Sequence, residues 1–574
     1  MTLFKLSLLA LACTSGVAAN ADAKGKHGAV VSEVKECSEI GVGVLKKGGA
    51  AADAIIATGL CVGVINAFHS GIGGGGFMIV RSPPVKKHAA TYETVDFREA
   101  MPALGNETMY SNNTNPTAST IGGLGVGVPG ELRGWEMLHK RHGKLPWASL
   151  FQPAINLAEN GYVVPKDLGD ALSAASYPFL LTNPLWAETY APNGTLAVQG
   201  DVLYRKRYAR TLSLIAKHGA DYFYSGALAA NTSAAAIAAG GILTPADLAN
   251  YTAIIRAPRN ITYGRARIFS TVAPSSGTCV LSALNVFAPY ASATETNETT
   301  HLLIQATKFA YGQRTNFGDP AFTANVTDLE ALYLEEATAE SIREILPHNT
   351  TYPAAYYDPS AYQVLSDNGT SHMAAVDQWG GAVSLTTTVN LYWGSRVMTE
   401  DGIVLNDEMD DFSSPNVTNS FGFLPSPVNY IRPGKRPQSS ISSSIAEDVQ
   451  TGEILIATGS AGGSRIITAT LQNLHNHLDL GKSANASVWT PRWHDQLGAT
   501  TLFEGFGSAF AAGGAALGMK QFGNGTIGWL AGRGYNVSGE DYTGSTSHVI
   551  VRGRDGVFEA ANDPRKSAGG GAAY

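Results

Sequence analysis

Apolar and polar positions change their period several times along the chain. Segments 370–377 and 382–391 alternate apolar and polar residues, which predicts two β-strands around the turn DQWGG. Segment 452–474 reads as a strand, a glycine-rich loop and a helix. Residues 29–67 read as a strand followed by a helix, and residues 130–260 are largely helical in pattern. Because no linker separates these blocks, we expect one large α/β or α+β body of layered sheets and helices.

The two strands around DQWGG bring polar side chains together. If Asp377 pairs with Ala382, Thr388 comes opposite Ser371 and shares a face with Asn390. Two polar side chains then lie beside the start of the first strand. A slip of one residue would change this arrangement, and an exposed threonine-rich strand has the same local pattern.

The chain begins with features of a secretory signal peptide. One early lysine precedes an apolar run that ends in small residues, so we assign residues 1–19 to a leader, with an uncleaved anchor as the alternative. The run is shorter than the ~20 apolar residues that span a bilayer. Fourteen of the 30 asparagines stand in N-x-S/T sequons. We therefore expect a glycoprotein that is secreted or displayed at the cell surface through the secretory pathway.

The net charge and the cysteine content reduce the number of partner and cofactor classes to consider. The net charge is −7 over 574 residues, which does not suggest a nucleic-acid partner. In an oxidising compartment we expect a Cys37–Cys61 disulfide and a buried free thiol at Cys279. Cys/His ligand spacing is absent, and the glycines of GIGGGGF follow a helix instead of a strand, so neither a metal nor a dinucleotide cofactor is predicted. The final residues, KSAGGGAAY, read as a frayed tail.

The stretch SDNGTSHMAAVD contains a candidate nucleophile. A cut between Gly369 and Thr370 would give the threonine hydroxyl a free α-amine on the same residue. The reference pKa of an α-amine is about 7.7–8.0, so the amine can serve as the base for that hydroxyl. Glycine before the cut permits strained backbone angles. An uncut glycine turn followed by an ordinary strand is the alternative.

Further polar groups would suit a substrate with an amino-acid head. Arg98 offers a fork for a carboxylate, unless it forms a surface ion pair with Glu99. The segment NDEMDDF could hold an ammonium group, or it could be a solvated turn or a calcium loop. Backbone N–H groups of Gly462 and Gly463 could form an oxyanion site before a helix, or an ordinary tight loop. The hydroxyls of PGKRPQSS are the last candidates.

Together these segments resemble the γ-glutamyltranspeptidase (glutathione hydrolase) family. GTSHMAAVD, SLTTTVNLYWGS, LNDEMDDFSSP, PGKRPQSS and GSAGGS are similar to the motifs of its small subunit. NAFHSGIGGGGFMIV, VDFREAMP and GVPGELRGW are similar to those of its large subunit, in the family's order. The resemblance implies an N-terminal-nucleophile hydrolase fold, an α+β four-layer αββα sandwich. It also implies a precursor that cleaves itself into residues 20–369 and 370–574, which remain one intertwined domain.

The resemblance implies a role for each candidate residue. Thr370 would be the nucleophile, Thr388 would bond near its amine, and the two glycines would form the oxyanion hole. The groups that would bind the α-carboxylate of the γ-glutamyl substrate are Arg98, Ser439 and Ser440. The groups that would bind its α-ammonium are Asn390, Glu408 and Asp411. Tyr392 would border the site, as in the animal-type members.

The implied reaction is hydrolysis or transfer of a γ-glutamyl group. Thr370 would attack the γ-glutamyl amide of glutathione or its conjugates, and water, an amino acid or a dipeptide would accept the acyl group. The implied partner is the second subunit from the same precursor. Animal members carry a Met-Cys-Pro-type sequence where this chain has ISSSI, and a second short-range disulfide that this chain lacks. A related amidase for another acyl donor and an inactive binding homologue remain alternatives.

Overall fold

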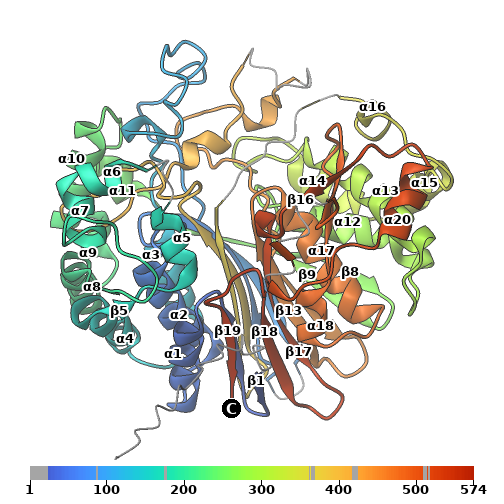
Figure 1. The fold of residues 1–574 in the computed structure, drawn as a ribbon, viewed down its shortest axis with the longest axis horizontal. Coiled ribbons are helices and arrows are strands. Elements are labelled where there is room, and N and C mark those ends of the chain that lie inside the picture. The colour runs from blue at the N-terminus through green and yellow to red at the C-terminus, as the bar shows by residue number, and fades with distance from the viewer. Residues whose placement is uncertain are drawn as a thin grey trace, which may run out of the picture.

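The fold is a sandwich of two sheets between helices. The computed structural model describes residues 23–574 except 86–87, 174–176, 361, 363–368, 416–423, 508–512 and 515–516. The predicted leader, residues 1–19, and the sequon residue Asn368 therefore lie outside the described residues. The two sheets stack in the middle of the molecule, and helices cover both outer faces (Figure 1). The predicted α+β class and four-layer αββα sandwich are confirmed.

Each central sheet has seven antiparallel strands. The first sheet has the order β1 (Ala23–Gly25), β18 (Phe558–Asn562), β17 (Thr546–Arg552), β13 (Ile454–Ala461), β12 (Ser444–Asp448), β9 (Ala266–Ser270), β8 (Arg259–Tyr263). The second has the order β19 (Gly570–Ala573), β2 (Ala29–Ser32), β10 (Ser371–Val376), β11 (Ala382–Thr388), β3 (Gly75–Ser82), β4 (Thr91–Asp96), β7 (Ile254–Arg256). β14 (Trp493–His494), β15 (Thr501–Glu504) and β16 (Val537–Glu540) form a small sheet, and β5 (Tyr162–Val163) pairs with β6 (Val202–Leu203).

Strand β10 shows how the layers are built from alternating residues. Ala374 and Val376 belong to the apolar cluster between the two sheets. Met373 and Ala375 point to the other side, into the core under the helices. Successive side chains of a strand point to opposite faces, so one short apolar strand supplies both cores.

Helices α1 (Lys35–Lys46) and α2 (Ala51–Ile65) cover the second sheet. The sequence pattern predicted one helix over this region, but the chain breaks it between residues 47 and 50. Gly48 adopts a left-handed conformation there, with φ of 87°. Every residue of α2 is buried, because the helix lies between the sheet and further helices. Those outer helices include α3 (Glu131–His142), α4 (Trp147–Asn160), α5 (Lys166–Ser173), α7 (Pro184–Tyr190), α8 (Lys206–His218) and α10 (Ala227–Ala238).

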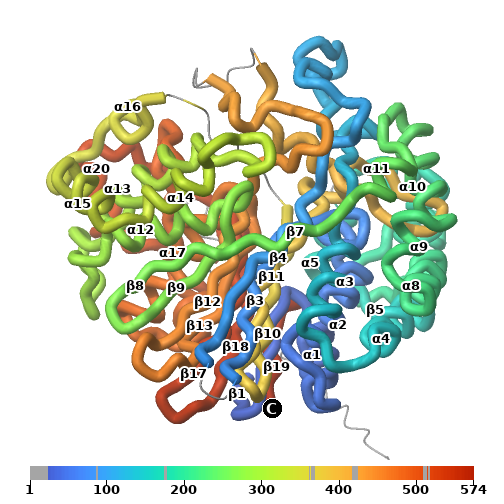
Figure 2. The backbone as a smooth tube through the Cα atoms, turned by 180° about the vertical axis from the view of Figure 1, so that it is seen from behind, coloured from blue at the N-terminus to red at the C-terminus, as the bar shows by residue number. Residues whose placement is uncertain are grey.

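The first sheet is covered by a second helical layer, on the opposite side of the molecule (Figure 2). Its helices are α12 (Gly277–Phe287), α13 (Asn297–Arg314), α14 (Val326–Tyr333), α15 (Glu336–Ile345), α17 (Arg465–Leu478), α18 (Ala484–Trp489) and α20 (Asn524–Ala531). Helix α17 follows β13 through a glycine loop, which confirms the strand, loop and helix predicted for that segment. None of the helices in the described part of the chain combines the length and apolar character needed to cross a membrane.

The register of the β10–β11 hairpin differs from the prediction by one residue. Val376, not Asp377, pairs with Ala382, and Ser371 pairs with Thr387. Asp377 stays in the turn, because its carboxylate accepts hydrogen bonds from backbone N–H groups of the turn. Continuing the observed register brings Thr388 opposite Thr370 itself.

The C-terminal residues form a strand, so the prediction of a frayed tail was wrong. β19 pairs with β2 along its whole length. The backbone of Tyr574 exchanges hydrogen bonds with His27 and Gly28. Small residues at the end of the chain allow this close approach, since a Cβ on Gly571 would lie 2.2 Å from the Ala560 carbonyl oxygen.

Both sheets mix strands from the two sides of residue 370. In the second sheet, β10, β11 and β19 come from the C-terminal part of the chain and their neighbours β2 and β3 come from the N-terminal part. In the first sheet, β12 pairs with β9 and β18 pairs with β1 across the same division. A cut before residue 370 would therefore leave two chains held by sheet hydrogen bonds and shared cores.

The predicted disulfide is present and yields a stability prediction. Cys37 and Cys61 are bonded and join α1 to α2, whereas Cys279 is a buried free cysteine. The bond closes a loop with a sequence separation of 24. We expect replacement of both bonded cysteines by alanine to lower the free energy of unfolding by about 3 kcal/mol. Denaturant unfolding would measure this loss. Cys279→Ala is the control, and equal stability of the double variant and the wild type would contradict the expectation.

Candidate functional site

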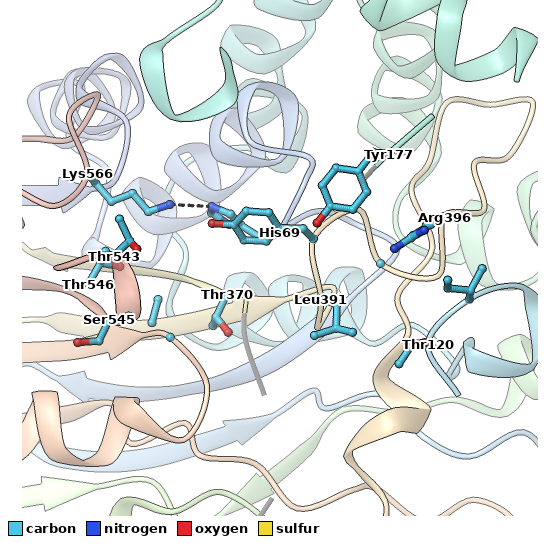
Figure 3. Close-up of a pocket in the computed structure, with 17 residues that line it drawn as sticks. His69, Thr120, Tyr177, Thr370, Leu391, Arg396, Thr543, Ser545, Thr546 and Lys566 are labelled. Atoms are coloured by element: carbon cyan, nitrogen blue, oxygen red, sulfur yellow. Dashed lines mark hydrogen bonds between the residues drawn. The ribbon is translucent and has the colours of Figure 1, made fainter. Parts of the chain in front are cut away.

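Thr370 lies immediately before β10 in the wall of a cavity of about 380 Å³. Thr370 is only 8% exposed to solvent. In Figure 3, Lys566 lies to the left of Thr370, Tyr177 and Arg396 lie to its right, and His69 lies above it between these two groups. β10 is hydrogen-bonded to β2 on one edge and to β11 on the other, so it is a central strand of the sheet. Thr370 is therefore attached to one of the most constrained strands of the fold.

The backbone at the Gly369–Thr370 bond is strained. Thr370 has φ of 125°, a value that a β-branched residue rarely adopts, and Gly369 has φ of 119°. Such a conformation costs about 1–3 kcal/mol and persists only where the surroundings impose it. A Cβ on Gly369 would lie 1.8 Å from the carbonyl oxygen of Asn390. Residue 369 therefore has to be glycine for both conformational and steric reasons.

Thr388 and Asn390 continue from the end of β11 beside Thr370. The backbone N–H of Asn390 donates to the hydroxyl of Thr388 at 2.7 Å. Asn390 has φ of 70°, and its side-chain amide donates to the carbonyl of Asp407 at 3.0 Å. The end of β11 is thus tied to the acidic segment that follows.

Gly462 and Gly463 form the turn between β13 and α17. Their φ values are 120° and 59°, so both lie in the region that favours glycine. Gly462 lines the cavity, and a Cβ there would lie 2.4 Å from the carbonyl of Gly544. Tyr311 anchors the turn by donating from its hydroxyl to the carbonyl of Ser464 at 2.6 Å. The arrangement brings the backbone of Gly462, three residues before α17, to the cavity wall.

Arg98 is buried and forms ion pairs with Glu408 and Asp411. The guanidinium donates one nitrogen to each carboxylate. It also donates to the carbonyls of Gln438 at 3.0 Å and Pro437 at 3.4 Å. The expected alternative for Arg98, a surface pair with Glu99, was wrong. Arg98 is 1% exposed, and the Glu99 carboxylate lies 4.0 Å away inside the same cluster. The acidic segment is likewise no solvated turn, because Glu408 and Asp411 are buried.

One guanidinium faces three carboxyl groups in this cluster. Burial alone would lower the pKa of Arg98, but Glu408 and Asp411 outweigh burial and raise it, so Arg98 stays charged. Burial raises the pKa of Glu99 to about 8, against the opposing effect of Arg98. Burial also raises the pKa of Glu408 well above its ordinary value. The cluster therefore holds more carboxyl groups than one cation can neutralise.

Ser439 and Ser440 lie next to the Arg98 cluster along the chain segment that contacts it. The hydroxyl of Ser439 accepts from the N–H of Ile441 at 3.2 Å. The hydroxyl of Ser440 accepts from the guanidinium of Arg314 at 3.0 Å. Both serines are buried.

The predicted site residues form two connected groups. Gly369, Thr370 and Gly462 line the cavity, whereas Arg98, Glu408 and Asp411 form a buried cluster that is not part of the lining. Asn390 links the two groups through Asp407. Among the residues that the structure describes, no cluster of three or more His, Cys, Asp or Glu side chains is arranged to hold a metal ion.

Sequence reasoning missed several residues of the cavity wall. His69 lies two residues before the glycine-rich stretch GIGGGGF, and Lys566 is the first residue of the segment interpreted as a frayed tail. Arg396 and Tyr177 also line the cavity, and the Arg396 guanidinium carbon lies 5.2 Å from the centroid of the Tyr177 ring. These residues lie far from Thr370 in sequence, and no local pattern identifies them. Tyr392 was expected at the border of the site, and it lines the cavity.

Comparisons with known proteins agree with this geometry. Residues 37–573 match the family model described as Gamma-glutamyltranspeptidase. The glutathione hydrolase proenzyme of Arthroderma benhamiae is 42% identical over 569 residues, covering 95% of this chain and 93% of that protein. The Helicobacter pylori gamma-glutamyltranspeptidase crystal structure has a TM-score of 0.51 and 31% identity, covering 56% of this chain and 91% of that chain.

A more distant structure shares the whole fold. The cephalosporin acylase from Bacillus halodurans has a TM-score of 0.82 and covers 99% of each chain, at 24% identity. This likeness concerns the fold alone. The family match and the extent of identity to the Arthroderma protein go further, and from them we conclude that the chain belongs to the gamma-glutamyltranspeptidase family.

Proposed function

We propose that this protein is a self-processing γ-glutamyl hydrolase and transferase that uses Thr370 as its nucleophile. The observation that carries the proposal is the strained Gly369–Thr370 bond, which lies in the wall of the same cavity as Gly462 and beside the end of β11. Cleavage of this bond would relieve the strain and release the threonine amine. Residues 20–369 and 370–574 would then be the large and small subunits of a heterodimer.

The chemistry would proceed through an acyl-enzyme. The freed α-amine of Thr370 takes the proton of the threonine hydroxyl as that oxygen bonds to the γ-carbonyl carbon of the donor. The amides of Gly462 and Gly463 would stabilise the resulting oxyanion. The proton then passes to the leaving amine as the C–N bond breaks. Water hydrolyses the acyl-enzyme, or the amine of an amino acid or dipeptide accepts the glutamyl group.

Arg98, Glu408 and Asp411 would bind the amino-acid end of the γ-glutamyl donor by exchanging ion-pair partners. The α-carboxylate of a γ-glutamyl group would replace a protein carboxylate on Arg98, with Ser439 and Ser440 as further donors. Its α-ammonium would pair with Glu408 and Asp411. A zwitterionic head adds one positive and one negative charge, so the net charge of the buried cluster does not change and every added charge finds a partner, which a head with a single charge cannot achieve. Asn390 would add a hydrogen bond to the ammonium.

We propose glutathione and its conjugates as donors, as the name of the Arthroderma relative suggests. The alternative of an amidase for another acyl group rests on likeness of fold alone. Entry into the secretory pathway remains part of the proposal, supported by exposed sequon residues such as Asn106, Asn193 and Asn260.

The first prediction concerns self-cleavage. We expect the wild-type protein, after deglycosylation, to contain two chains, one of which begins with Thr370-Ser-His-Met. Thr370→Ala should remain one inactive chain, because it lacks the attacking hydroxyl. Thr370→Ser retains the hydroxyl and should still be cut. Intact mass and N-terminal sequencing measure all three. A cut Thr370→Ala chain would show that Thr370 does not cleave its own bond.

The second prediction concerns the residue before the cut. Gly369→Ala places a Cβ against the carbonyl of Asn390, so we expect self-cleavage to slow at least tenfold. Gly194→Ala is the matched control, because Gly194 also has a positive φ of 82° but no atom within 4 Å of the added Cβ. A time course of the uncut chain on a denaturing gel measures both rates. Equal rates for the two variants would argue against steric control at residue 369.

The third prediction separates donor binding from folding. Arg98→Ala would leave buried carboxylates without a partner, at a cost of about 3–5 kcal/mol of stability. Arg98→Lys retains the charge and should mature, but it loses the two-pronged contact. We expect its KM for a γ-glutamyl donor to rise roughly ten- to a hundredfold, from a loss of about 1.5–3 kcal/mol.

The matched control for Arg98→Lys is Arg205→Lys. Arg205 is also buried, but its guanidinium donates to backbone carbonyls elsewhere in the fold. Steady-state kinetics and thermal melting should be measured on both matured variants. An unchanged KM for Arg98→Lys would remove Arg98 from the donor site.

A further inference from the structure

Three polar side chains from distant parts of the chain meet beside Thr370. Glu33 follows β2, His69 follows α2, and Lys566 lies between β18 and β19. The imidazole Nε2 of His69 lies 3.3 Å from the Lys566 ammonium and 3.3 Å from a Glu33 carboxylate oxygen. The ammonium lies 3.9 Å from the same oxygen. The proposed chemistry gives this cluster no role.

The cluster directs its positive end toward the cavity. Lys566 and His69 line the cavity, as Figure 3 shows, whereas Glu33 is fully buried and is not part of the lining. Burial alone would lower the pKa of Lys566, but Glu33 and more distant acidic groups outweigh burial and raise it. Burial, reinforced by Lys566, lowers the pKa of His69 well below its ordinary value. The imidazole is therefore neutral, and Lys566 carries the positive charge.

Thr370 faces the same cavity as this charge. Thr370 and Lys566 line the same cavity of about 380 Å³. The side chain of Ser371, the next residue, lies close enough to Glu33 to lower the pKa of its carboxyl, although burial dominates and raises that pKa. A charge acts over about 8–10 Å even in salt solution, and burial weakens the screening.

We propose that Lys566, held in place by Glu33 and His69, keeps the freed α-amine of Thr370 unprotonated so that this amine can accept the hydroxyl proton. A second positive charge on the amine would be repelled by the ammonium, so the neutral amine is favoured. Lys566 acts through Thr370 and is a positioning residue. No proton passes through Lys566. The inference rests on the proposed function, because the amine exists only after the cut.

Other charged groups around the cluster act in both directions. Asp167, Asp563 and Tyr392 favour the charged form of Lys566. His548 is fully buried, and its pKa is lowered to about 4 by burial, so it is neutral. Arg396 is a second cation of the cavity wall, on the other side of Thr370. The sum of these charges at the cavity surface is positive, which is the sign that the proposal requires.

The test is the pH profile of kcat/KM for Lys566→Met with γ-glutamyl-4-nitroanilide, which releases an uncharged amine. Loss of the positive charge raises the pKa of the Thr370 amine, so the acid limb of the profile should move to higher pH by about one unit. Activity should fall about tenfold near pH 6.5 and recover near pH 9. Lys566→Arg retains the charge and should keep the limb at the wild-type position.

Lys308→Met is the matched control, because Lys308 is also buried and pairs with Asp495, away from the cavity. Only the matured two-chain form of each variant is assayed. A pH-independent loss in Lys566→Met, or an equal shift in Lys308→Met or Lys566→Arg, would overturn the inference. If the wild type releases no nitroaniline at any pH, the proposed function itself fails, an outcome distinct from an unshifted limb.

Discussion

The structure depends on the central position of β10 in the second sheet. This strand is hydrogen-bonded to β2 on one edge and to β11 on the other, and its two faces enter different apolar cores. A strand held on all four sides leaves little freedom to Thr370, the residue that immediately precedes it. The conformation forced on Thr370 is therefore sustained by the sandwich, which is how a stable fold can hold a strained bond at one point.

The same arrangement explains why a cut at this point is compatible with a stable protein. Each sheet is assembled from strands on both sides of residue 370, so the hydrogen bonds that join the two parts greatly outnumber the one covalent bond lost. The C-terminal strand β19 adds to this interleaving and leads directly from Lys566 at the cavity. The end of the chain thus supports the site, and the last strand is a structural part of the second sheet.

Charge is arranged in two separate groups around the nucleophile. The Arg98 group combines one guanidinium with several buried carboxyl groups and is internally paired in this structure. The Lys566 group directs a single cation toward the cavity from a neutral histidine and a buried glutamate. The first suits recognition of a zwitterionic head, and the second suits control of proton affinity at Thr370. Both groups act strongly on neighbouring charges, because water screens charges only weakly in the protein interior.

The sequence by itself determined which polar side chains are available to the site, and it determined the disulfide. It also determined the two strands around DQWGG and the succession of strand, loop and helix around Gly462. These features depend on local periodicity, on glycine where φ is positive, and on a small number of cysteines. Only the tertiary structure decided the register that brings Thr388 opposite Thr370, the pairing of Arg98 with Glu408, and the place of Lys566 in the cavity wall. Those contacts join residues far apart in the chain. They arise from how the sheets and helices pack, and packing leaves no periodic signal in any single segment.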